Sequence, residues 1–205
     1  MAETIQQQLR ERLDDPAVAV KYGDEQQTWR EHLAGAATEA AALLGIADHS
    51  RPLHVGVLLG NTPDMLTALA AAGLGGYVLC GINNTRRGAA LRRDILHADC
   101  QILLTDSDHR HLLDGLELPG VRVFEIGTEE WATLLAGAGP LTPHREVGPM
   151  DTFMLIFTSG TSGEPKAVQV PHVTVLIAGS ALVQRFGISN SDVCYLSMPF
   201  RRAKT

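Results

Sequence analysis

The residues best suited to chemistry form a polar run directly after an apolar one. Five apolar residues, 153–157, are followed by Thr158-Ser159-Gly160-Thr161-Ser162-Gly163-Glu164-Pro165-Lys166. The apolar run predicts a buried strand that delivers a polar loop to a site. Glycines let backbone N–H groups turn towards one anion, hydroxyls add donors, and the lysine adds a compact positive charge. The stretch therefore predicts a phosphate-binding loop.

Two other interpretations fit this loop less well. A plain surface turn accounts for a bare Thr-Ser-Gly, but the context of the loop argues against it. The spacing from Gly160 to Lys166 approximates that of a P-loop NTPase. However, Pro165 replaces the glycine before the lysine, and Ala167 stands where a Mg²⁺-binding Ser or Thr is needed. The residues after Lys166 also alternate like a strand, whereas a P-loop opens a helix.

The stretch from Phe157 to Val168, with His172 shortly after it, resembles the phosphate-loop signature of the adenylate-forming (AMP-binding) superfamily. This superfamily includes acyl-CoA synthetases, adenylation domains and luciferases, and the chain is most similar to bacterial fatty-acid:CoA ligases. The signature is specific because hydroxyls, glycines, Pro and Lys all lie in register behind an apolar strand. Ala167 departs from the family, which usually has Gly there. The resemblance covers essentially all of residues 1 to about 200, weakly at first and strongly from Asp151.

The resemblance implies a two-step reaction on a fatty acid or another carboxylate. The carboxylate attacks the α-phosphate of ATP to give an acyl-adenylate and pyrophosphate, and the thiol of CoA then displaces AMP to give a thioester. Positioning and electrostatic stabilisation carry both steps, because no protein nucleophile is needed. Mg²⁺ is expected as well, since adjacent phosphates repel each other and oxygen ligands suit this cation.

The same resemblance assigns roles to the loop residues. Lys166 is the expected catalytic residue, because it would offset charge on the leaving pyrophosphate. The glycines let the backbone approach the nucleotide, and the hydroxyl residues donate to the β- and γ-phosphates. The expected cofactor-binding residues are Thr158, Ser159, Gly160, Thr161, Ser162, Gly163 and Lys166. No metal ligand is assigned.

Family members continue for more than twice the length of this 205-residue chain. The regions that bind adenine and ribose, line the acyl tunnel and supply a C-terminal catalytic lysine are expected to be missing. The similarity ends after Pro199, where the family typically continues with Leu-Phe-His and this chain has Phe200-Arg201-Arg202-Ala203-Lys204-Thr205. We therefore expect the N-terminal part of a ligase, left by truncation, a frameshift or a gene fragment. The alternatives are a non-catalytic remnant that at most binds nucleotide phosphates, and an adenylating enzyme with a carrier-protein acceptor.

Composition narrows the class of protein. The formal net charge of −6 argues against nucleic acid as the main partner. No segment reaches the apolar length of a transmembrane helix, and the first residues lack a secretory signal, so a cytoplasmic protein is expected. The cysteines are odd in number and lack metal-type spacing, which favours reduced core thiols: Cys80, Cys100 and Cys194.

Apolar periodicity predicts alternating strands and helices. Strands are expected at 17–22, 54–59, 77–82, 101–105, 121–126, 153–157, 167–170 and 193–198, and helices at 5–13, 29–45, 65–74, 86–98, 129–136 and 173–186. Thr28 and Glu31 fit a capping box for the second helix. Repeated strand, helix, strand units predict an α/β fold with mostly parallel sheets and helices on both faces. The resemblance identifies this fold as the N-terminal portion of the acyl-CoA synthetase-like large domain.

We expect the chain to divide into four segments. Residues 1–136 form a first βα layer of the AMP-binding N-terminal domain, and 137–150 are a Gly- and Pro-rich, linker-like stretch. Residues 151–199 carry the phosphate loop, and 200–205 are the divergent tail. A truncated sheet exposes apolar edges and faces, so self-association through exposed apolar surface is expected.

Other polar residues have simpler explanations than catalysis. Four arginines of one predicted helix could attract the phosphates of CoA, but such a set usually forms a solvated face: Arg86, Arg87, Arg92 and Arg93. His109 and His111 lie near Asp106 and Asp108, yet without a convincing third ligand an exposed polar turn is preferred to a metal site.

His172, Asn61 and the loop serines also have explanations other than catalysis. His172 is expected to pack at a helix start, and the resemblance raises it to a neighbour of the site. Asn61 follows a predicted strand and is explained as a cap. Ser159 and Ser162 lack the Gly-x-Ser-x-Gly elbow, so a serine hydrolase is a poor interpretation.

Overall fold

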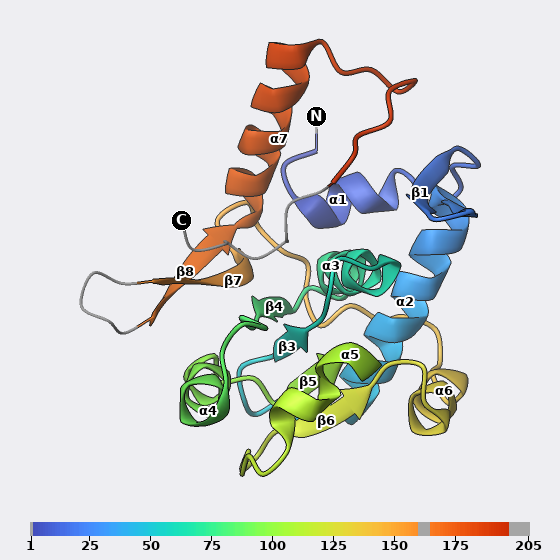
Figure 1. Ribbon diagram of the computed structural model, residues 1–205. Helices are drawn as coiled ribbons and strands as arrows, with labels where there is room; N and C mark the ends of the chain where they lie inside the picture. The colour runs from blue at the N-terminus through green and yellow to red at the C-terminus, as the bar shows by residue number, and fades with distance from the viewer. Residues whose placement is uncertain (1, 160–164, 197–205) are drawn as a thin grey trace.

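Six strands form one sheet, and a small hairpin stands apart from it in the computed structural model, which describes residues 2–159 and 165–196 (Figure 1). The sheet strands are β3 (His54–Leu58), β4 (Val78–Gly81), β5 (Ile102–Thr105), β6 (Arg122–Glu125), β7 (Thr152–Ser159) and β8 (Pro165–Pro171). Their order is β6-β5-β3-β4-β7-β8. All neighbours are parallel except β7 and β8, which are antiparallel. The hairpin pairs β1 (Val18–Tyr22) with β2 (Glu25–Thr28).

Helices cover both faces of the sheet (Figure 1). One core cluster lies between the sheet and α1 (Ile5–Arg10), α2 (Trp29–Ile46), α3 (Pro63–Gly75) and α6 (Glu129–Ala136). A second cluster lies between the other face and α4 (Gly88–His97), together with the short helix η1 (His111–Leu113), which follows α5 (Ser107–Arg110). Strand β5 supplies both clusters, with Ile102 and Leu104 on one side and Leu103 on the other. This two-sided burial explains its unbroken apolar run.

Local signals set several helix starts. At the start of α2, the Glu31 N–H donates to Thr28 Oγ1 (3.2 Å) and the Thr28 N–H donates to Glu31 Oε2 (2.9 Å), so the predicted capping box is confirmed. Pro63 occupies the first turn of α3, where its missing N–H costs nothing. The predicted α/β fold with a mostly parallel, doubly covered sheet is confirmed.

Two predicted elements differ from the structure, and one strand of the structure was not predicted. The helix expected over 5–13 ends at Arg10. Strand β2 was not expected, because Glu25, Gln26 and Gln27 are polar; it forms through backbone pairing with β1 at the protein surface. The strand expected over 193–198 is wrong for residues 193–196, which are not in a strand, and residues 197 and 198 lie outside the described residues.

Residues 137–150 pack along the helical layer before β7 begins. The buried Gln6 side chain donates to the carbonyls of Leu74 (3.3 Å) and Arg145 (3.2 Å) and accepts from the Val147 N–H (3.3 Å). The His144 N–H donates to the Gly75 carbonyl (2.8 Å). These bonds place the end of this segment against α1 and α3, so that β7 enters the sheet beside β4.

The cysteines divide into two groups. Cys80 and Cys100 are free thiols in the second core cluster, as expected, and burial raises the pKa of Cys100 to about 12. Cys194 is exposed, so the prediction of a core thiol is wrong there. Its expected strand does not form, and the residue has no core to enter. Among the described helices, none combines the length and the apolar character needed to cross a membrane.

Candidate functional site

The predicted strand before the phosphate loop is β7, and it lies inside the sheet. Leu79 and Gly81 of β4 pair with Met154 and Ile156 on one side of it, and β8 pairs on the other. Phe153 is buried in the first core cluster, whereas Leu155 and Phe157 are buried in the second. The apolar run 153–157 is therefore explained by burial on both faces.

The structure places the two ends of the predicted phosphate loop side by side. Thr158 and Ser159 are the last residues of β7, and their backbones pair with those of Lys166 and Pro165 in β8. Lys166 is exposed, while its neighbour Ala167 packs against the second core cluster. The remaining predicted site residues lie outside the described residues: Gly160, Thr161, Ser162 and Gly163. The backbone hairpin thus holds Lys166 beside the carboxyl end of β7.

The secondary structure that contains Lys166 distinguishes this loop from the P-loop of an NTPase. In a P-loop NTPase the lysine opens a helix whose N-terminus faces the phosphates. Here Lys166 belongs to β8, an antiparallel strand that ends at Pro171 before α7 (His172–Phe186) begins. The strand predicted over 167–170 is confirmed, and the positive charge comes from a strand rather than from a helix start.

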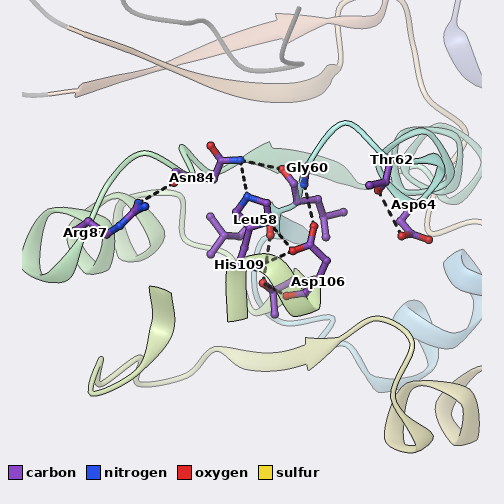
Figure 2. Close-up of polar contacts among 10 residues, drawn as sticks. Leu58, Gly60, Thr62, Asp64, Asn84, Arg87, Asp106 and His109 are labelled. Atoms are coloured by element: carbon purple, nitrogen blue, oxygen red, sulfur yellow. Dashed lines mark hydrogen bonds and ion pairs between the residues drawn. The ribbon is translucent and has the colours of Figure 1, made fainter. Parts of the chain in front are cut away.

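A second polar cluster lies at the same edge of the sheet, where β3, β4 and β5 end (Figure 2). Asp106 Oδ2 accepts from the Gly60 N–H (2.9 Å), and Oδ1 accepts from the His109 N–H (2.9 Å) and also contacts His109 Nδ1. Asn84 Nδ2 contacts His109 Nε2 (2.9 Å) and donates to the Leu59 carbonyl (3.3 Å). Because Asn84 donates to Nε2, the proton of the neutral imidazole lies on Nδ1 and faces Asp106.

The strand order makes this edge a switch point of the sheet. Strands β4 and β5 flank β3 on opposite sides, and their connecting helices α3 and α4 cover opposite faces. Ligands of open α/β sheets commonly bind beyond the strand ends at such a point. In this chain the Asp106, His109 and Asn84 side chains bond to one another and to backbone, so the cluster joins three loops.

The sequence prediction for this cluster was partly wrong. His111 is exposed as expected, but His109 is partly buried and belongs to a hydrogen-bonded network, not to an exposed turn. The signal that could have found the network is position, because Gly60, Asn84 and Asp106 each follow a strand. Within the part of the chain that the structure describes, no group of three or more His, Cys, Asp or Glu side chains could hold a metal ion.

The arginines around α4 do not form a purely solvated face. Arg86 Nε lies 3.2 Å from Oδ2 of Asp94, whose side chain is buried. Burial raises the pKa of Asp94, and the nearby positive charges of Arg86 and Arg93 oppose that rise. Arg87 donates to the Asn84 carbonyl (2.8 Å), and Arg92 donates to the Glu117 carbonyl (2.8 Å). The prediction of a solvated face missed these partners because they come from other parts of the fold.

His172 is a packing residue at the start of α7, as expected. Its side chain is buried, and its ring lies 5.0 Å from that of Phe153 between centroids. Its backbone N–H donates to the Asp151 carbonyl (3.1 Å). Burial lowers the pKa of His172, which favours the neutral ring. This contact fixes the junction of β8 and α7 against β7.

Comparison with known proteins assigns the chain to one family. A profile of the AMP-binding enzyme family, described as "AMP-binding enzyme", matches residues 5–201, and the chain belongs to that family. Over 181 residues it is 47% identical to the medium/long-chain-fatty-acid–CoA ligase FadD17 of Mycobacterium marinum. That match covers 88% of this chain and 35% of the relative, so the chain spans about a third of the length of this curated relative.

Solved structures share the fold. A putative long-chain-fatty-acid CoA ligase from Rhodopseudomonas palustris superposes with a TM-score of 0.80 at 24% identity, over 92% of this chain and 49% of that one. The N-terminal domain of FACL13 from Mycobacterium tuberculosis gives a TM-score of 0.76 at 21% identity, over 90% of this chain and 47% of that one. The expected portion of the fold is therefore confirmed: the chain matches the N-terminal portion of acyl-CoA synthetase structures.

Proposed function

We propose that this chain is the nucleotide-phosphate-binding part of an ATP-dependent ligase that joins a fatty acid to CoA. The observation that carries the proposal is the β7–β8 hairpin, which pairs Lys166 with Thr158 across the two ends of the loop. A lysine fixed in a strand at the loop's end is placed to meet the phosphates that the loop would hold. The similarity to FadD17 supports a fatty acid as the carboxylate and CoA as the acceptor.

In the proposed reaction, a carboxylate oxygen of the fatty acid attacks the α-phosphorus of ATP. The bond from that phosphorus to the bridging oxygen breaks, and pyrophosphate leaves with the electron pair. The thiol of CoA then attacks the acyl carbon of the adenylate, loses its proton and displaces AMP. Negative charge grows on the pyrophosphate oxygens during the first step, so a fixed positive charge beside them lowers the barrier.

The loop residues take their proposed roles from this charge development. Thr158, Ser159, Thr161 and Ser162 donate to the β- and γ-phosphates, and Gly160 and Gly163 let the backbone approach. Lys166 offsets the charge of the leaving group, and its exposure in β8 leaves the ammonium group available. This donor set suits phosphate rather than a metal, so Mg²⁺ would arrive on the phosphate oxygens of ATP. A reaction that consumes ATP and CoA suits the proposed cytoplasmic location.

The test is fatty-acid-dependent exchange of pyrophosphate into ATP, measured on the 205-residue chain, on Lys166→Ala and on Lys21→Ala. Lys21 is an exposed strand lysine in the β1–β2 hairpin and serves as the matched control. Exchange that persists in Lys21→Ala and falls at least about tenfold in Lys166→Ala supports the proposed first step. Folded protein that binds ATP but gives no exchange would instead identify a non-catalytic, phosphate-binding chain. Adenylation that proceeds without transfer to CoA would favour a carrier-protein acceptor.

A further inference from the structure

The side-chain amide of Asn84 bridges two partners with one nitrogen. Its Nδ2 donates to the Leu59 carbonyl directly after β3 (3.3 Å) and contacts Nε2 of His109 (2.9 Å) (Figure 2). A carbonyl oxygen only accepts hydrogen bonds, so the amide nitrogen, and not the amide oxygen, must face Leu59. The same nitrogen faces His109, and the hydrogen bond between them therefore requires an Nε2 that carries no hydrogen.

Protonation of His109 removes that acceptor. An imidazolium carries a hydrogen on each ring nitrogen, so Nε2–H and the Asn84 amide would point donors at each other. Turning the amide over gives Nε2–H an acceptor, but it then sets the amide oxygen against the Leu59 carbonyl. Asn84 can thus keep both partners when His109 is neutral and only one of them when His109 is charged.

The other nitrogen of the ring responds differently. His109 Nδ1 contacts Oδ1 of Asp106, and this nitrogen carries a hydrogen in the charged ring as well as in the neutral one. A positive charge on the ring strengthens the contact, because charge-assisted hydrogen bonds are the stronger ones. Asp106 in turn accepts from the Gly60 N–H in the loop after β3 (2.9 Å). Protonation therefore keeps the loops after β3 and β5 joined and weakens the tie to the loop after β4.

The charged groups near His109 come from three segments of the described chain. They are Asp106, Asp108 and Arg110 of its own segment, Arg87 of the loop after β4, and Asp64 at the start of α3. Arg87 donates to the Asn84 carbonyl (2.8 Å), and the charge of Asp106 acts on Asp64. Carboxylates and guanidinium groups ordinarily keep their charge between about pH 5 and 8, whereas histidine changes its charge in this range.

We propose that His109 is a proton-sensitive switch for the loop between β4 and α4, residues 82–87, which we call the β4–α4 loop. With His109 neutral, Asn84 holds the loop to both Leu59 and His109. With His109 charged, Asn84 loses one of these two bonds, and the β4–α4 loop opens more often. The contact of His109 with Asp106 persists in both states.

The β4–α4 loop begins beside the strand that leads into the predicted phosphate loop. Gly81, the last residue of β4, pairs with Ile156 of β7. Acidification therefore loosens a neighbour of the carboxyl end of β7, while the ends of β3 and β5 stay joined. The inference rests on the hydrogen bonds of Asn84 and His109 and not on the proposed catalytic activity, so the two can fail separately.

Hydrogen exchange at two pH values tests the switch. Backbone exchange of the 205-residue chain is measured at about pH 8 and about pH 5.5, and each rate is divided by the intrinsic rate at that pH. We expect the protection of residues 83–87 to fall at least about fivefold at the lower pH, the factor that corresponds to one lost hydrogen bond. Protection of β3 and β5 should not fall. Equal or higher protection of residues 83–87 at the lower pH would overturn the proposal.

Substitutions separate the switch from other effects of pH. His109→Gln removes the titrating ring, and His111→Gln removes an exposed histidine two residues further on, as the matched control. We expect His111→Gln to keep the loss of loop protection at low pH and His109→Gln to abolish it. Asn84→Ala lacks the bridging amide, so its loop protection should be low at both pH values. A loss of equal size in His109→Gln would assign the pH dependence to another group and overturn the proposal.

NMR of the unsubstituted chain covers a variant that does not fold. Nitrogen-15 shifts of the His109 imidazole report which ring nitrogen carries the hydrogen, and the side-chain amide signals of Asn84 report its bonds. We expect a neutral ring with the hydrogen on Nδ1 at about pH 8, and Asn84 signals that move together with those of His109 as the pH falls. A neutral ring with its hydrogen on Nε2, or Asn84 signals that ignore the protonation of His109, would contradict the switch.

Discussion

Lys166 pairs with Thr158 in the antiparallel β7–β8 hairpin, so the lysine is held one strand away from the end of the buried strand that leads into the loop. The pairing continues inward through Ala167 and Phe157, and both of these side chains pack with the second core cluster. The position of the lysine is therefore set by backbone hydrogen bonds and by core packing, and not by the loop alone.

Ala167 departs from the glycine usual in the family, and the structure explains what the alanine does. Its methyl group packs against the second core cluster. We predict that Ala167→Gly lowers the free energy of unfolding by about 0.5–1 kcal/mol, because glycine loses more backbone freedom in a strand. Nucleotide binding should stay unchanged. Urea unfolding with an ATP titration checks both, and a large loss of binding in a folded variant would show that the alanine shapes the loop.

Glu39 of α2 makes stability depend on pH. Burial, with a smaller contribution from the charge of Asp64, raises the pKa of Glu39 from 4.5 to about 8. The folded state therefore favours the protonated acid, and this stability is fully present below pH 4.5 and is lost as the pH rises to about 8. Each pKa unit corresponds to about 1.4 kcal/mol, so the total loss is several kcal/mol.

Glu39→Gln tests this linkage. The variant keeps the shape of the protonated acid but cannot ionise, so we predict that it is more stable than the parent chain at pH 8 and similar at pH 5. Urea unfolding at both pH values gives the comparison. A stability difference that is the same at pH 5 and pH 8 would mean that Glu39 does not ionise with a raised pKa.

The almost fully buried carboxylate of Asp94 lies 3.2 Å from Arg86 Nε and 3.9 Å from Arg93 Nε, so Arg86 is the nearer of its two ion-pair partners. We predict that Arg86→Ala destabilises the chain by about 3 kcal/mol at pH 8, because the buried carboxylate loses its nearest charge. The pKa of Asp94, already raised by burial, should rise further. The destabilisation should therefore shrink as the pH falls and Asp94 takes up a proton.

Arg110→Ala is the matched control, since Arg110 pairs with the exposed Asp114 at 3.6 Å. An exposed pair of this kind contributes about 0–1 kcal/mol. Thermal and urea unfolding of both variants at pH 5 and pH 8 measures the difference. Similar small effects from the two substitutions would show that Asp94 is not stabilised by Arg86.

Sequence patterns predicted the elements whose causes are local. The capping box of Thr28 and Glu31 needs only four neighbouring residues. Strands β5 and β7 were predicted from their runs of apolar residues, because both strands are buried on both faces. Strand β2 was missed because Glu25, Gln26 and Gln27 carry no apolar signal and depend on pairing with β1. The strand expected over 193–198 shows the opposite case in its described residues, 193–196: the apolar pattern is present, but no described strand pairs with it.

The candidate site also contains residues that local sequence predicted and residues that only the fold brings together. The loop and Lys166 were predicted from residue types in order, and the strand after Lys166 was predicted from alternation. The network of Asn84, Asp106 and His109 was not, because these residues come from two loops and meet only when β4 and β5 flank β3. The sequence also did not predict that Arg86 pairs with Asp94 or that Arg92 donates to the Glu117 carbonyl.

The most direct measurement is an isothermal titration of the folded 205-residue chain with ATP and Mg²⁺, alongside Lys166→Ala and Lys21→Ala. We predict binding by the parent chain and by Lys21→Ala, and affinity at least about tenfold weaker in Lys166→Ala, since a charge-assisted hydrogen bond contributes about 1.5–3 kcal/mol. No binding by the folded chain, or equal binding by the two lysine variants, would contradict the claim that the β7–β8 hairpin places Lys166 at a nucleotide phosphate site.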